Sequence, residues 1–169
     1  MKRCVAVLLL SVITAGVLFG CSSVPKEELY PVEIKMGMTV DEVRAIMGGE
    51  GEYEENATLD QSELYYEYGL RLNEMTGGIS YWFDKKNRKL VEISIFAYNA
   101  QDGEYITNEE LKNESEDYLT RKFGKPDVEK TGYAVWGVKD RDVMFTLSFS
   151  DARIIVERYN PYFCNEEPE

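Results

Sequence analysis

The sequence contains no histidine among its 169 residues. Histidine is the side chain best suited to acid–base catalysis at neutral pH and the commonest metal ligand. Its absence excludes Ser-His and Cys-His nucleophile pairs and removes the usual ligands of a zinc site. Paired carboxylates could still carry acid–base chemistry, but none lies in the apolar sequence setting expected of a catalytic carboxylate. We therefore expect a protein that is not an enzyme and that has no cofactor and no metal site.

Basic residues are also in the minority, with 19 Lys and Arg against 31 Asp and Glu and a net charge of −12. An acidic surface repels phosphate backbones, which argues against nucleic acid as a partner. A common alternative role for acidity is solubility. The hydrophobic content of 44% and the charged content of 30% are typical of a globular protein long enough for one domain with its own core.

The N-terminus has the three parts of an export signal. Lys2 and Arg3 are followed by the apolar run Val5–Phe19 and then by Gly20 and Cys21. The hydrophobic part of a secretory signal spans about 7–15 residues, whereas a membrane-spanning helix needs about 20. The run matches the shorter class, so we expect residues 1–20 to be a cleaved signal peptide and not a retained anchor.

Leu18, Gly20 and Cys21 resemble the bacterial lipobox, in which the cysteine is lipidated and the chain is cut just before it. The alternative is an ordinary secretory signal followed by a coincidental cysteine. Lipidation of Cys21 would place the protein in the cell envelope, on the outer side of the cytoplasmic membrane or on the outer membrane, because two or more acyl chains anchor stably. Cys164 would then be the only thiol left, free or paired between molecules, and we expect it to be free and inert.

Two segments are predicted to be helices because each begins with a capping box and ends at a glycine. In a capping box the Thr hydroxyl accepts from a helical N–H three residues on, and the Glu side chain accepts from the Thr N–H. Apolar residues then recur at helical spacing. The boxes are Thr39 with Glu42 and Thr107 with Glu110, and the helices end at Gly48 and Gly124.

Three strand-like segments follow each predicted helix, separated by short turn sequences. This order predicts an α+β fold of two repeats, at 33–99 and 104–160, each a helix plus a three-stranded antiparallel meander. Together they would form one two-layer domain over 33–164, after a tether at 21–32 and before an acidic tail at 165–169. The segments are Leu64–Leu72, Ile79–Asp84, Leu90–Tyr98, Tyr133–Lys139, Val143–Phe149 and Ala152–Tyr159.

Alternation along these segments divides them into two faces, because successive side chains of a strand point to opposite sides. One set is strongly apolar and is expected to lie beneath the helices. It consists of Tyr66, Tyr68, Leu70, Leu72, Ile79, Tyr81, Phe83, Val91, Ile93, Ile95, Val143, Phe145, Leu147, Phe149, Ile154 and Val156.

The opposite face mixes aromatic and acidic residues, a composition favoured at protein interfaces. We expect its aromatic residues to bind a partner, although a covering segment or simple strand propensity would also account for them. Within 133–139 the alternation also allows Trp136 to pack inward. The candidate partner-binding residues are Tyr65, Trp82, Phe96, Tyr98 and Trp136.

Residues 36–48 read Met-Gly-Met-Thr-Val-Asp-Glu-Val-Arg-Ala-Ile-Met-Gly, and residues 81–84 read Tyr-Trp-Phe-Asp. These two stretches resemble the SmpA/OmlA family of small lipoproteins, which carries Gly-Met-Thr, an acidic-Val pair and later an aromatic-Phe-Asp turn. The resemblance implies a helix-plus-meander unit of the beta-lactamase-inhibitor-protein-like fold, whose inhibitors carry two such repeats. The family's Gly-x-Pro occurs here only at 124–126, after the second predicted helix.

The sequence thus favours a non-enzymatic protein-binding module of the cell envelope, and the resemblance suggests a role in outer-membrane or envelope assembly. Its partners would be the membrane, through the lipid, and another envelope protein. The alternative is an inhibitor of a secreted or periplasmic hydrolase. It would probe an active site with the acidic loop Gly48–Asp60 or with Gly77-Gly78, unless that loop is simply solvated.

Overall fold

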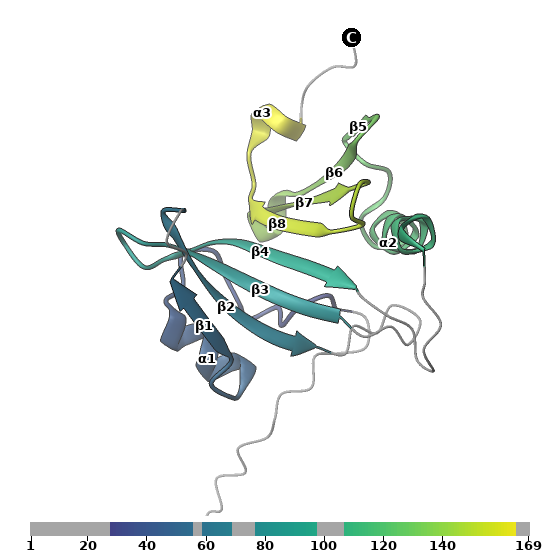
Figure 1. Cartoon of the computed structure of the whole chain (residues 1–169). Helices are drawn as coiled ribbons and strands as arrows, with labels where there is room; N and C mark the ends of the chain where they lie inside the picture. The colour runs from purple at the N-terminus through teal and green to yellow at the C-terminus, as the bar shows by residue number, and fades with distance from the viewer. Residues whose placement is uncertain (1–27, 56–58, 69–76, 98–106, 165–169) are drawn as a thin grey trace, which may run out of the picture.

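The computed structural model describes residues 28–55, 59–68, 77–97 and 107–164 (Figure 1). Within these ranges the chain forms one eight-stranded antiparallel sheet with three α-helices. The prediction of an α+β protein is therefore confirmed. None of the helices in the described ranges is long and apolar enough to cross a membrane.

Helices α1 (Val40–Met47) and α2 (Asn108–Phe123) begin at the two predicted capping boxes. In the first, the Thr39 hydroxyl accepts from the Glu42 N–H at 3.3 Å, and the Glu42 carboxylate accepts from the Thr39 N–H at 2.7 Å. These bonds from Thr39 lower the pKa of Glu42, because they stabilise its charged form. Helix α1 ends at Gly48, whose φ of 69° is left-handed, as glycine allows.

The eight strands form one sheet in the order β1-β2-β3-β4-β8-β7-β6-β5, so that β4 and β8 join the first and second halves of the chain. All six predicted strand segments are present, although residues 69–72 and Tyr98 lie outside the described residues. Strands β1 and β5 were not predicted, because both are short and lack an apolar alternation. The strands are β1 (Glu52–Glu55), β2 (Gln61–Tyr68), β3 (Gly77–Asp84), β4 (Leu90–Ala97), β5 (Val128–Lys130), β6 (Tyr133–Val138), β7 (Val143–Ser148) and β8 (Ile154–Arg158).

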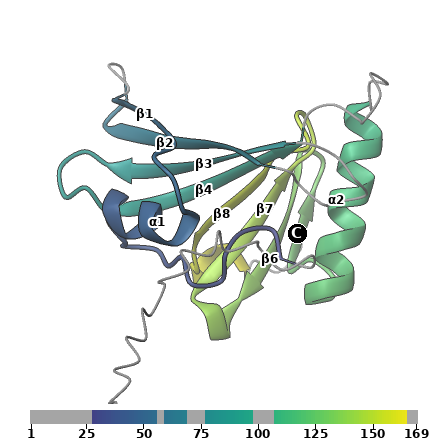
Figure 2. The same ribbon diagram turned by 90° about the horizontal axis from the view of Figure 1, so that it is seen from below.

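Helices α1 and α2 pack on the same face of the sheet, which we call the inner face (Figure 2). Val43 of α1 and Leu119 of α2 are fully buried in one apolar cluster with Tyr81 and Phe145. The ring of Phe123 stacks on that of Phe145, with centroids 4.7 Å apart. Full burial of an aliphatic or aromatic side chain contributes about 1.5–3 kcal/mol, so this layer stabilises the fold.

One predicted inner residue, Val91, faces solvent with 37% of its surface exposed. The β3–β4 register shifts between Trp82 and Phe83, and Phe83 pairs with Leu90. A bulge adds one residue to the alternation, so the neighbouring residue takes the core position. Leu90, 1% exposed, replaces Val91 there.

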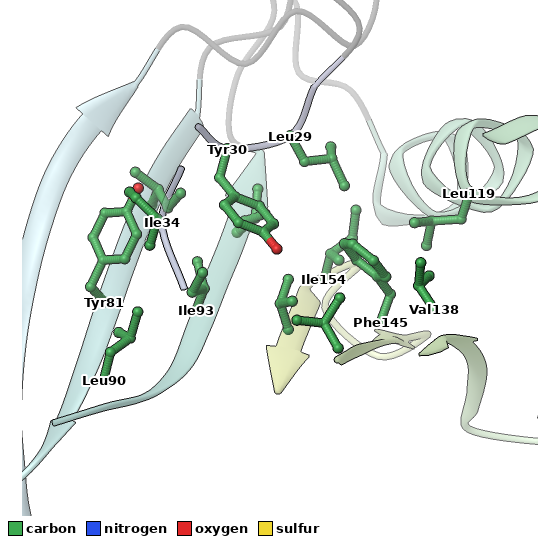
Figure 3. Packing of buried hydrophobic residues seen from close by; sticks show 14 of the residues in the cluster. Leu29, Tyr30, Ile34, Tyr81, Leu90, Ile93, Leu119, Val138, Phe145 and Ile154 are labelled. Atoms are coloured by element: carbon green, nitrogen blue, oxygen red, sulfur yellow. The ribbon is translucent and has the colours of Figure 1, made fainter. Parts of the chain in front are cut away.

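The predicted tether is too long, because Leu29 and Tyr30 belong to the core (Figure 3). The Tyr30 ring lies 6.5 Å from that of Phe145, and burial raises the pKa of Tyr30 to about 12. The Glu28 carboxylate pairs with Lys122 of α2 at 2.8 Å. The folded body therefore begins no later than Glu28, on the helix-bearing side of the sheet.

Candidate recognition surface

The surface of the sheet opposite α1 and α2, here called the outer face, contains most of the predicted binding residues. Strand register places four of its side chains in one row across β2, β3, β4 and β8. Glu63 is opposite Trp82, Trp82 is opposite Glu92, and Glu92 is opposite Glu157. Trp82 therefore lies between two carboxylates, in a half-buried position.

Tyr65 and Phe96 lie on the outer face on either side of β3, with their rings stacked at 6.1 Å and nearly parallel. They meet over Gly78, where a Cβ would come within 2.5 Å of Tyr65 Cε2 and 2.8 Å of Phe96 Cε2. The missing side chain of Gly78 thus makes room for the pair. Tyr65, Trp82 and Phe96 share the outer face, as the alternation predicted, and all three are half-buried.

Trp136 does not lie on the outer face. The prediction that its side chain is available there to bind a partner is therefore wrong. Its side chain is 1% exposed, lies in the core opposite Phe145, and donates its indole N–H to the Gly124 carbonyl at 3.0 Å. The residues around it in β6 are apolar or small on both sides, so alternation alone could not choose a face. Tyr98 and Cys21, the other two candidates, lie outside the described residues.

A short helix, α3 (Pro161–Cys164), covers the outer face at its β5–β6–β7 end. The buried thiol of Cys164 packs there with Val128, Val135 and Met144, and burial raises its pKa. Cys164 forms no disulfide with another described residue of the chain, and the expectation that it is not paired between molecules remains a prediction. Helix α3 has only four residues, too few for a periodic pattern in the sequence that would have predicted this cover. The uncovered remainder of the described outer face lies over β1, β2, β3, β4 and β8.

That remainder has charge of a single sign. Burial, and then the neighbouring Glu92, raise the pKa of Glu157, because both disfavour its carboxylate. No lysine or arginine occupies an outward position in these five strands as the structure describes them. The outward carboxylates are Glu52, Glu54, Glu63, Glu67, Asp84, Glu92 and Glu157.

Two clefts lie away from the outer face. One, of about 450 Å³, is lined in part by Glu28, Tyr30 and Arg141. The other, of about 520 Å³, is lined in part by Lys122, Lys139 and Arg141. The Glu28 carboxylate between them is already paired with Lys122 and Arg141. Among the described residues, no group of three or more acidic or cysteine side chains is placed to hold a metal ion.

The segments considered as inhibitory probes are partly built into the sheet. Within the predicted loop Gly48–Asp60, β1 pairs with β2 along Glu52–Glu55. Gly77 and Gly78 are buried at the start of β3 and pair with β4. Neither of these stretches is a free loop, because its backbone is committed to strand pairing.

Compared with protein-family models, curated proteins and solved structures, the chain finds no match. Within the described residues, the outer face, with its three half-buried aromatic rings and its carboxylates, is the strongest indication of function.

Proposed function

We propose that this protein is a lipid-anchored component of a bacterial cell envelope that binds another protein through its outer face. One observation carries the proposal: Tyr65, Trp82 and Phe96 are half-buried together on the side of the sheet that α1 and α2 do not cover. Aromatic residues are enriched at protein interfaces and supply much of their binding energy.

The anchoring part of the proposal is supported by the lipobox-like residues before Cys21 and by the early start of the fold. Seven residue steps separate Cys21 from Glu28, and such a chain reaches at most about 25 Å. Glu28 enters the fold on the helix-bearing side, through its ion pair with Lys122. A lipid on Cys21 would hold the body close to the membrane and leave the outer face on the opposite side.

We further propose that the chain consists of two tandem repeats related to the SmpA/OmlA unit. The element order supports this, since α1 is followed by β1–β4 and α2 by β5–β8. Each run would thus be a helix plus a four-stranded meander, with one more strand than the sequence predicted. The repeats would meet at the β4–β8 pair.

The anchor is tested with Cys21→Ser in the native host. We expect the wild-type protein to sediment with membranes and to incorporate labelled fatty acid, and the variant to do neither. Membrane partitioning that is unchanged in Cys21→Ser would show that the attachment lies elsewhere.

The recognition surface is tested by photocrosslinking in cells, with a benzoylphenylalanine introduced at position 82. Asp117, exposed on α2, provides a control position on the helix-bearing side. We expect a discrete protein adduct from position 82 and none of the same mass from position 117. Absence of an adduct at 82, or the same adduct from both positions, would contradict binding through the outer face.

A further inference from the structure

The charge of the outer face indicates what kind of partner it fits, on the condition that the proposed function holds. Seven carboxylates point outward from β1, β2, β3, β4 and β8, with no basic residue among the described outward positions of these strands. The basic residues gather elsewhere, for example in the β3–β4 turn at 85–89 and around the cleft lined by Lys122 and Lys139. Among the described outward positions of these strands, the aromatic residues are therefore flanked by carboxylates only.

The arrangement is unfavourable in the isolated protein. Glu54 is directly opposite Glu63, and Glu92 is directly opposite Glu157. Like charges at opposed positions of neighbouring strands repel and destabilise the sheet. Counter-charge from a partner would remove this repulsion, whereas an apolar or acidic partner would bury it and increase its cost.

Trp82 lies between the two like-charged pairs, because it is opposite both Glu63 and Glu92. Its indole nitrogen is buried without a hydrogen-bond acceptor among the described residues. An aromatic face flanked by carboxylates suits a guanidinium group, which stacks on the ring and donates to carboxylate oxygens at its edges.

Serine hydroxyls hold the two flanking carboxylates in place. Ser80 donates to Glu63, and Ser94 donates to Glu92 at 2.8 Å. A carboxylate can accept more than one hydrogen bond, so each retains capacity for a partner's donor. Both serines are almost fully buried, which limits the freedom of the groups they orient.

We propose that the partner presents a cationic segment, rich in arginine or lysine, to the row Glu63-Trp82-Glu92-Glu157. Charge complementarity selects this occupant, and the stacked pair of Tyr65 and Phe96 beside the row offers further aromatic surface. The outer face thus combines the two kinds of group that recognise arginine.

The test uses the full chain in a neutral detergent and a fluorescein-labelled peptide of nine arginines as the probe, followed by fluorescence anisotropy. The variant Glu63→Gln/Glu92→Gln/Glu157→Gln removes three charges while preserving side-chain shape and the serine hydrogen bonds. We expect saturable binding by the wild type and a tenfold or larger loss of affinity in this variant. Circular dichroism checks that the variant is folded.

A second triple variant, Glu33→Gln/Glu50→Gln/Asp117→Asn, provides the matched control. These three side chains are exposed and lie outside the outer face, and the change in net charge is the same. We expect less than a twofold change in affinity. An equal loss in both triple variants would show that the probe senses net charge only and would overturn the inference.

Trp82→Ala gives an independent measurement that changes no charge. We expect it to weaken the arginine peptide at least threefold, through loss of the ring between the carboxylates. A wild-type protein that fails to bind the peptide saturably, but still forms the adduct from position 82 in cells, would retain the recognition surface and exclude a cationic partner.

Discussion

The two faces of the sheet are built from the same strands but follow opposite rules. On the inner face Ile79, Tyr81 and Phe83 are fully buried beneath the helices, and no charge lies among them. On the outer face the intervening positions of the same strand hold Ser80 and Trp82, next to carboxylates on both neighbouring strands. Alternation within one strand thus places the fully buried apolar residues on one side of the sheet and the polar and half-buried aromatic residues on the other.

Unlike the residues of the inner face, those of the outer face are not explained by folding stability alone. An outer face that only needed to be soluble would mix both signs of charge, because opposed unlike charges stabilise a sheet and opposed like charges destabilise it. Here Glu92 and Glu157 are opposed, and Glu157 has a raised pKa as a result of burial and of that neighbour.

The largest expected difference in stability is between the alanine variants of the two tryptophans, which lie on opposite faces of the sheet. Trp136→Ala should lower the free energy of unfolding by about 3–5 kcal/mol, because it opens a large cavity in the core and removes the donor to Gly124. Trp82→Ala should cost about 1 kcal/mol, because its half-buried side chain already has solvent on one side. Urea unfolding measures both. Equal losses would mean that the outer face is packed like the core.

Gly78→Ala should cost about 1–2 kcal/mol, because the new methyl group would overlap the rings of Tyr65 and Phe96 and separate the stacked pair. Gly132→Ala is the matched control, since no heavy atom lies within 4 Å of its Cβ position. Thermal unfolding should distinguish the two. If Gly78→Ala were as stable as the wild type, the pair would not depend on the missing side chain.

Thr107→Ala removes the N-cap of α2 and should lower stability by about 1 kcal/mol. The Glu110 carboxyl, whose pKa is lowered by its hydrogen bonds with Thr107, favours the folded state above its ordinary pKa. The difference between variant and wild type should therefore shrink as the pH falls through the folded-state pKa of Glu110. Arginine-peptide binding should be unaffected, because α2 lies on the inner face; a change in binding would show that the two faces are coupled.

Glu157→Gln should raise stability by roughly 0.5 kcal/mol at pH 7, the smallest expected effect. The raised pKa means that the folded state disfavours the carboxylate, so the wild type loses stability as the pH rises above the ordinary carboxyl pKa. The advantage of the amide should accordingly vanish below about pH 4, where Glu157 is protonated in both states. Denaturation midpoints at both pH values measure this, and a destabilised variant at pH 7 would refute the assigned repulsion.

Much of the inner face could be predicted because its signals are local. The Thr39 and Thr107 capping boxes act within one helical turn, and alternation in β3 extends over a few residues. The bulge that puts Leu90 in the core position expected for Val91 could not be predicted in this way, because it depends on the pairing of two strands.

The outer face was predictable only where its strands alternate clearly. Tyr65, Trp82 and Phe96 fall on it as expected, whereas Trp136 does not, because β6 is apolar or small on both sides. The binding role assigned to the first three remains a prediction. The cover provided by α3 depends on contacts between Cys164 and strands up to about thirty-five residues earlier, and no local pattern encodes these contacts.

By itself, the sequence determined where α1 and α2 begin and end and which side chains of most strands share a face, because caps and alternation depend on near neighbours. The tertiary structure alone decided that β4 pairs with β8, that Tyr30 fills the core beside Phe145, and that Glu92 is opposite Glu157. These contacts join residues distant in the chain, and they form only when burying the two halves together outweighs the entropy of closing the intervening chain.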